Sequence, residues 1–255
     1  MLKPRLIPVL LCQNNALVKT VNFEEGKYVG DPINAVRIFN EKMVDELCFC
    51  DISSDPAFMR PNFKLIEKLS YECRMPLLYA GGVKTIDEIE KLIGLGVEKV
   101  GIGLGSGNRL GLIGEATKRL GNQSIVGFIN VKKTNDEYVT YFNNGSHSIG
   151  KTLPEAIQNG HEAGVGEFVI NSIDRDGKMS GFDEELIEAT LSIADQTPVT
   201  IVGGAGNWDD VSRAYKKYGL IGLGVGSLCV FKGPFKAVLI NYPDVEKKTE
   251  LMSKP

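Results

Sequence analysis

The sequence lacks several features that mark secreted, membrane or disulfide-rich proteins. Its five cysteines are odd in number, and no two of them stand at the Cys-x-x-Cys spacing of common metal and redox motifs. This pattern predicts reduced thiols in a cytoplasmic protein. No run approaches the roughly 18 apolar residues of a membrane-spanning helix, and the first residues do not resemble a cleavable signal peptide.

An excess of charge is also missing, because the formal net charge of the 255 residues is only −3. The composition therefore predicts neither a nucleic-acid groove nor a basic patch for a membrane surface. His147 and His161 have no partners at metal-ligand spacing, so we expect no metal and no other cofactor. Apolar residues make up 43% of the chain, which excludes a disordered protein.

What the chain does have is a regular alternation of short apolar runs with longer helical patterns. Thr85 with Glu88 has the spacing of a helix capping box, and Asp183 and Asn207 are further candidates for helix starts. The eight apolar runs, typical of parallel strands buried on both faces, are residues 6–11, 46–51, 77–79, 99–102, 125–131, 167–171, 199–202 and 221–225. Eight strand–helix units predict an α/β protein with the (β/α)8 fold, a TIM barrel.

An open, doubly wound sheet is the alternative, because Gly101-Ile-Gly-Leu-Gly-Ser-Gly107 resembles a dinucleotide-binding loop. The string lies in mid-chain and has no acidic partner at the required distance, so it is a weak signature. A repeat favours the barrel, since Gly81-Gly82 recurs as Gly203-Gly204, 122 residues later. We therefore expect one domain over residues 1–255, with half-barrels at about 1–122 and 123–240 and a polar C-terminal tail.

Glycine-rich turns at the predicted carboxyl ends of strands indicate phosphate binding, because backbone N–H groups approach an anion closely only where no Cβ intervenes. The alternative is that these glycines serve only to make tight turns between strands and helices. The second-half set is Gly203, Gly204, Gly206, Gly226 and Ser227, and the first-half set is Gly81, Gly82 and residues 103–105. We expect the second-half set to be the stronger site, since Leu104 interrupts the first.

Longer strings carry a family resemblance over nearly the whole chain. The most specific is Ser172-Ile-Asp-Arg-Asp-Gly177 with Ser180-Gly181. The others are Arg5-Leu-Ile-Pro8, Val18-Lys-Thr-Val-Asn-Phe23, Gly30-Asp-Pro32, Asp45-Glu-Leu47, Asp51-Ile52, Gly81-Gly82 and Gly203-Gly-Ala-Gly206. In these strings the sequence resembles the cyclase subunit of imidazole glycerol phosphate synthase, the barrel subunit of histidine biosynthesis.

The resemblance implies a heterodimer with a class I glutaminase, whose ammonia travels along the barrel axis to a bis-phosphorylated ribulosyl substrate. It also implies two catalytic aspartates at the ends of the first and fifth strands, where this sequence has Leu11 and Asn130. Neither side chain exchanges a proton near neutral pH, so we do not expect ordinary cyclase activity. The residues expected at the substrate and its phosphates are Lys19, Asp51, Gly82, Asp176, Gly177, Gly203, Gly204, Gly226 and Ser227.

Two of these expectations have alternatives. Lys19 and Asp51 could instead form a structural ion pair. Of the two aspartates that flank Arg175, the resemblance assigns Asp176 to the ligand and leaves Asp174 to orient the loop.

Four charged residues lie at the predicted amino ends of strands, on the opposite face of the barrel. The resemblance matches them with the ring of paired charges at the family's ammonia entrance. The alternative is ordinary solvated strand ends, whose ion pairs contribute at most about 1 kcal/mol. Two positive and two negative charges at converging positions favour a retained ammonia gate, because burial without pairing would be costly. The four residues are Arg5, Glu46, Lys99 and Glu167.

The leading interpretation is the synthase-side barrel of a glutamine-dependent amidotransferase that serves an acceptor other than the histidine-pathway substrate. The resemblance suggests a nucleotide-linked or surface-polysaccharide sugar as that acceptor, held by a third protein, a sugar-amidating ligase. One alternative is an ordinary cyclase that works with Asp51 or Asp176. The other is a non-catalytic scaffold barrel that regulates a partner.

Overall fold

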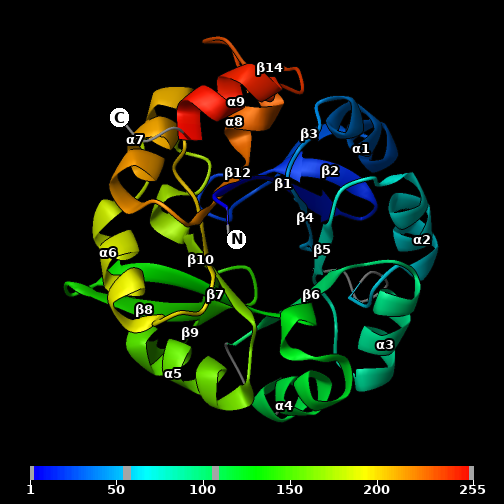
Figure 1. Cartoon of the computed structure of the whole chain (residues 1–255), viewed down its shortest axis with the longest axis vertical. Helices are drawn as coiled ribbons and strands as arrows, with labels where there is room; N and C mark the ends of the chain where they lie inside the picture. Colours follow the sequence, from blue (N-terminus) through cyan, green and yellow to red (C-terminus); the bar gives the residue numbers. More distant parts are fainter. Residues whose placement is uncertain (1–2, 54–58, 105–108, 253–255) are drawn as a thin grey trace.

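Eight parallel strands form a closed barrel that helices surround (Figure 1). The computed structural model describes residues 3–53, 59–104 and 109–252. Each barrel strand pairs with the next along the chain, and the last pairs with the first, which closes the ring. The barrel strands are β1 (Arg5–Gln13), β4 (Leu47–Asp51), β5 (Leu77–Ala80), β6 (Lys99–Gly103), β7 (Ile125–Thr134), β10 (Glu167–Ser172), β11 (Val199–Val202) and β12 (Gly222–Val225). The predicted TIM barrel is confirmed, and the open sheet is excluded because no barrel strand is left as an edge.

Helices connect the strands on the outside of the barrel, and several begin at the predicted caps. The side chains of Thr85 and Asn207 each accept a backbone hydrogen bond in a capping box, and Asp183 caps a third helix. The helices are α1 (Pro32–Glu41), α2 (Phe63–Glu72), α3 (Ile86–Gly94), α4 (Arg109–Leu120), α5 (Leu153–Ala163), α6 (Glu184–Ile193), α7 (Trp208–Tyr218), α8 (Ser227–Val230) and α9 (Val245–Met252). None of the helices in the described ranges is long and apolar enough to cross a membrane.

Apolar side chains pack in two layers, as the alternation along barrel strands requires. The larger layer lies between the sheet and the helices. The smaller layer fills the barrel lumen and includes Ile7, Val9, Cys48, Leu78, Val126, Val169 and Val202. The five cysteines are free thiols, and the sulfur atoms of Cys48 and Cys50 lie 3.5 Å apart in the lumen. The lumen is therefore lined almost wholly by apolar side chains.

Short antiparallel strands that sequence reasoning did not predict extend the barrel sheet at its carboxyl face, next to β1 and β7. They are β2 (Ala16–Lys19), β3 (Lys27–Gly30), β8 (Glu137–Phe142) and β9 (His147–Thr152). Two further strands, β13 (Phe231–Lys232) and β14 (Ala237–Val238), form a separate two-stranded sheet. β2 pairs with both β1 and β3, and Lys19 is the last residue of β2. The turn between β8 and β9 reaches toward the loop after β4, where the Asn144 amide nitrogen donates to the Ile52 carbonyl at 2.9 Å. These additions therefore help to enclose the carboxyl face.

The C-terminal segment, expected to be a polar tail, folds as α9 and packs against α7. Leu251 and Tyr242 are buried, and the Lys248 ammonium donates to an Asp45 carboxylate oxygen at 2.6 Å. Within α9, Leu251 faces the rest of the fold whereas Val245 is exposed, so one apolar contact and one ion pair hold this mostly polar segment in place.

Candidate functional site

A cavity of about 790 Å³ opens at the carboxyl ends of the barrel strands, and we call it the mouth. Its wall includes Leu11 from β1, Asp51 from β4, Asn130 from β7 and Asn171 from β10, while β2 contributes Lys19. The structure thus brings together all the residues expected at the substrate, namely Lys19, Asp51, Gly82, Asp176, Gly177, Gly203, Gly204, Gly226 and Ser227.

Lys19 and Asp176 lie close enough to perturb each other within the mouth. Lys19 is buried, and its ammonium donates to the Val9 carbonyl. Burial lowers the pKa of Lys19, and the charge of Asp176 opposes this shift. Burial also raises the pKa of Asp176, although a 2.9 Å hydrogen bond from the Thr20 hydroxyl and the charge of Lys19 oppose it. Both pKa values move toward neutrality, which favours proton exchange at these two groups.

Asp51 occupies a different part of the mouth wall. Its carboxylate accepts a 3.0 Å hydrogen bond from the Ser53 backbone N–H. Burial raises the pKa of Asp51, and the hydrogen bonds from Ser53 act in the opposite direction. Within the described residues Asp51 forms no ion pair with Lys19, so the structural ion pair considered for these two residues is not formed.

The second-half glycines are required by the packing of the chain itself. Gly203 and Gly204 have φ values of +100° and +104°, which favour glycine. A Cβ on Gly204 would lie 2.2 Å from the Gly181 carbonyl oxygen. A Cβ on Gly226 would lie 2.9 Å from the Lys19 ammonium nitrogen. Tight turns therefore account for Gly203 and Gly204, whereas Gly226 leaves room for a functional group of the mouth.

The first-half turn differs from the second at the end of β6. The Leu104 backbone N–H donates to the Phe128 carbonyl at 2.9 Å, and the Leu104 side chain is buried. This N–H is therefore not free for an anion. Gly81, Gly82 and Gly103 line the mouth, while residue 105 of the predicted set lies outside the described residues.

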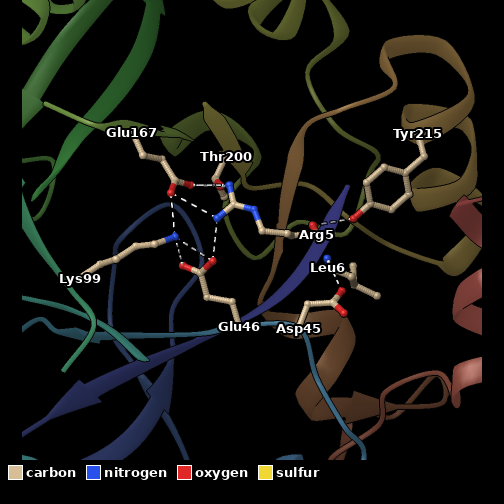
Figure 2. Close-up of polar contacts among 8 residues, drawn as sticks. All are labelled: Arg5, Leu6, Asp45, Glu46, Lys99, Glu167, Thr200 and Tyr215. Atoms are coloured by element: carbon tan, nitrogen blue, oxygen red, sulfur yellow. Dashed lines mark hydrogen bonds and ion pairs between the residues drawn. The ribbon is translucent and has the colours of Figure 1, made fainter. Parts of the chain in front are cut away.

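Figure 2 shows Arg5, Glu46, Lys99 and Glu167 converging at the opposite, amino-terminal face of the barrel, where they form a closed ring of ion pairs. The Arg5 guanidinium lies 2.6 Å from Glu46 and 2.7 Å from Glu167. The Lys99 ammonium lies 3.0 Å from Glu46 and 2.9 Å from Glu167. Every member thus contacts both residues of opposite charge.

The ring is largely removed from water, with Glu46 and Glu167 only 2% and 5% exposed. Burial disfavours the charged form of Glu167, but the hydrogen bond and charge of Arg5 and the charge of Lys99 outweigh it and lower the pKa. For Arg5, burial is likewise outweighed by Glu167 and Glu46, and the pKa is raised. Arg5 and Glu167 are therefore both ionised at neutral pH, as a paired ring requires.

A fifth polar residue, Thr200 of β11, belongs to the ring and was missed by sequence reasoning. Its hydroxyl donates to Glu167 at 2.8 Å and accepts from Arg5 at 3.4 Å (Figure 2). Thr200 is 2% exposed. The available signal was a polar residue inside the apolar run 199–202, close to the amino end of its strand.

Comparison with known proteins places the chain in a family. Residues 5–235 match the model for the histidine biosynthesis protein family. The chain belongs to this family. It is 45% identical over 253 residues to a Leptospira borgpetersenii protein named provisionally as imidazole glycerol phosphate synthase subunit HisF, covering 98% of this chain and 99% of that one.

Two further proteins show how similar this chain is in sequence to other members of the histidine biosynthesis family. A Pseudomonas aeruginosa protein with the provisional name hisF2 is 45% identical over 248 residues, covering 97% of this chain and 98% of its own. The HisF subunit of Natranaerobius thermophilus is 32% identical over 217 residues, covering 85% and 86%.

The mouth of this chain departs from the pattern that the resemblance implies at the two catalytic positions. Leu11 and Asn130 line it at the positions that the resemblance gives to catalytic aspartates. Asn171 lies beside Asn130 in the β7–β10 register, and its buried amide oxygen has no hydrogen-bond partner among the described residues. Asp176 lines the mouth, whereas Asp174 accepts a 2.8 Å hydrogen bond from the Lys133 backbone.

Proposed function

We propose that this chain is the synthase-side barrel of a glutamine-dependent amidotransferase. In this proposal a class I glutaminase binds its amino-terminal face, and ammonia passes through the lumen to the mouth. The acceptor is not the histidine-pathway ribulosyl substrate. The observation that carries the proposal is the closed ring of Arg5, Glu46, Lys99 and Glu167 at one end of an apolar lumen.

The ring suits ammonia because its charges cancel and each is already paired. A hydrated ammonium ion would have to lose its water between these groups and then enter a lumen lined by side chains such as Val9, Val169 and Val202. That desolvation is costly for a charged species and far less so for neutral ammonia. A small displacement of one ring member would admit the neutral molecule and keep water-borne ions out.

The mouth supports an acceptor other than the histidine-pathway substrate. Leu11 and Asn130 cannot serve as general acid and base, because neither titrates near neutral pH. The 45% identity to proteins with provisional names, one of them numbered hisF2, against 32% to the HisF subunit, points the same way. The acceptor we propose is a nucleotide-linked or surface-polysaccharide sugar held by a third, sugar-amidating protein.

A second candidate is the cyclase of imidazole glycerol phosphate synthase, working with different residues. The raised pKa values of Asp51 and Asp176 favour it, because carboxyl groups that titrate closer to neutrality can transfer protons. Both residues line the mouth. The two candidates share the glutaminase and differ in the acceptor.

The test is to express the chain with the class I glutaminases of its source and to purify complexes. We expect one glutaminase to co-purify, and its hydrolysis of glutamine to be insensitive to the histidine-pathway ribulosyl substrate. Stimulation by that substrate together with its conversion would establish the cyclase instead. A barrel that binds no glutaminase would leave the scaffold interpretation and refute the proposal.

A further inference from the structure

The mouth contains a cation to which none of the roles above has been assigned. Arg109 is the first residue of α4, and its half-buried side chain lines the cavity next to the end of β6. One guanidinium nitrogen lies 3.8 Å from the point where a Cβ on Gly103 would stand. With the residues that the structure describes, Arg109 forms no hydrogen bond and no ion pair.

Two carboxylates of α3 and α4 are already bound by other cations. Arg109 also borders a second cavity of about 640 Å³, lined by residues of α3 and α4. Among its described lining residues only Glu115 carries a carboxylate, and Arg119 holds it at 2.6 Å. Glu88, at the start of α3, is held at 2.5 Å by Arg60. Within the described ranges of the chain, the guanidinium of Arg109 therefore lines the mouth without an ion-pair partner.

This position is unfavourable for a cation in the empty protein. Burial lowers the pKa of Arg109, and no carboxylate in the described part of the chain opposes the shift. Arginine nevertheless stays charged, so the protein bears the cost of a partly desolvated, unpaired guanidinium. An anion beside Arg109 would offset this cost.

The usual backbone donors for such an anion are reduced in this half of the barrel. The Leu104 N–H is bonded to Phe128, and leucine has no side-chain donor to replace it. A guanidinium supplies two parallel N–H donors in a plane, a geometry that fits a carboxylate or a phosphate. In this half of the mouth, the Arg109 guanidinium can therefore replace the backbone N–H donor that Leu104 does not offer.

We propose that Arg109 is the anion-binding residue of the first half of the mouth and binds an oxyanion group, a carboxylate or a phosphate, of a ligand that enters the cavity beside Gly103. The assignment stands apart from the glutaminase partnership, since it concerns the opposite face of the barrel. A barrel that binds no glutaminase would leave it untouched.

The experiment titrates the whole chain with inorganic phosphate and, separately, with malonate in dilute chloride buffer. Binding is followed by calorimetry and by the Nε–Hε signal of Arg109, which is assigned from its absence in Arg109→Ala. The matched control is Arg119→Ala, which removes the same charge from the same helix at an exposed residue paired with Glu115. We expect the Arg109 signal of the unmodified chain to move with at least one anion. Arg109→Ala should lose that binding at least tenfold, and Arg119→Ala should keep it.

Phosphate binding alone or malonate binding alone would each support the site and decide which oxyanion it prefers. In buffer without either anion, Arg109→Ala should melt no lower than Arg119→Ala, because it removes an unpaired charge. Equal anion binding by the two variants, or an Arg109 signal that neither anion moves, would overturn the proposal. A lower melting temperature of Arg109→Ala would overturn it as well, because it would show that Arg109 stabilises the fold.

Discussion

The Thr200 hydroxyl donates to the same carboxylate oxygen of Glu167 that receives an N–H of Arg5. Because Thr200 belongs to β11 and Glu167 to β10, this bond connects one side of the ring to a neighbouring strand. Among the described residues the Lys99 ammonium contacts only the two glutamates. We therefore expect Arg5 and Glu167 to be the fixed side of the ring and Lys99 the side that moves.

Thr200→Val should fold but loosen this side of the ring. Valine has nearly the same shape and lacks the hydroxyl, so Glu167 loses a buried donor at a cost of about 1–2 kcal/mol. Urea unfolding measures the loss, and faster rotation of the Arg5 guanidinium in NMR spectra reports the loosening. Thr200→Ser should restore both. An unfolding free energy and an Arg5 signal equal to those of the unmodified chain would show that Thr200 plays no part in the ring.

Lys99→Ala should separate glutamine hydrolysis from amination in the complex with a glutaminase. Losing one member costs roughly 1–3 kcal/mol, which a protein with about 5–15 kcal/mol of stability survives. The ratio of aminated product to glutamate should fall, while free ammonium still supports product formation. Lys217→Ala, which removes an exposed lysine paired with Glu184, is the control. If glutamine hydrolysis and amination stay fully coupled in Lys99→Ala, the four ring residues are ordinary charged strand ends and not a gate.

Stability should depend on the ionisation of Glu167. Its folded pKa is lowered from 4.5 because the hydrogen bond and charge of Arg5 and the charge of Lys99 outweigh burial. The carboxylate therefore stabilises the fold above its unfolded pKa, and this contribution is lost as the pH falls through the lower folded value. We expect Glu167→Gln to be less stable than the unmodified chain at pH 7, with the difference closing in acid below about pH 4. Thermal unfolding across pH tests this, and a constant difference would refute it.

The isolated barrel with saturating ammonium should not convert the histidine-pathway ribulosyl substrate at a useful rate. Leu11 and Asn130 each remove a proton-transfer group worth roughly 10²–10⁴-fold in rate. Restoring both aspartates should recover little, since Leu104 also interrupts the first-half glycine set and its N–H is already bonded. Chromatographic product analysis decides the matter. Turnover within tenfold of an ordinary cyclase would refute the prediction and favour Asp51 or Asp176 as substitutes.

Anions should occupy the two halves of the mouth in a defined order. In crystals soaked with phosphate or sulfate, density should appear first at Gly204, Gly226 and Ser227, where the glycine turns and a serine hydroxyl remain. The first half should fill at higher concentration, because the Leu104 N–H is already bonded. Occupancy refined over a concentration series gives the order. Equal occupancy throughout, or filling of the first half alone, would contradict it.

The parts of the fold that were predicted correctly depend on local patterns. Apolar runs gave the barrel strands, and side-chain caps such as Thr85 and Asn207 gave helix starts. Convergence of the four ring charges followed from topology alone, because the amino ends of parallel barrel strands meet at one face. The residues expected in the mouth line one cavity for the corresponding reason at the carboxyl ends.

The parts that were missed depend on contacts between distant segments or on turns. Asn14 and Asn15 have φ values of +50° and +66°, the left-handed turn of a hairpin, and two asparagines between apolar runs are a signal that could have predicted β2. In the sequence Thr200 is one residue of a buried strand, and only the structure shows that its hydroxyl contacts Glu167 and Arg5. Arg109 follows a glycine-rich string, and the sequence gives no sign that its side chain has no partner among the residues the structure describes.

The C-terminal helix has a consequence for the symmetry of the barrel. The Tyr242 hydroxyl donates to the Leu6 carbonyl at 2.9 Å, while Lys248 binds Asp45, whose other oxygen accepts the Leu6 N–H at 3.0 Å. These residues lie beyond both repeated halves, yet they brace β1 one residue from Arg5. The two halves are thus mechanically unequal, because within the described residues these C-terminal hydrogen bonds support the first strand and not its counterpart β7. Shortening the chain after residue 240 would disturb the ion-pair ring before it disturbed the mouth.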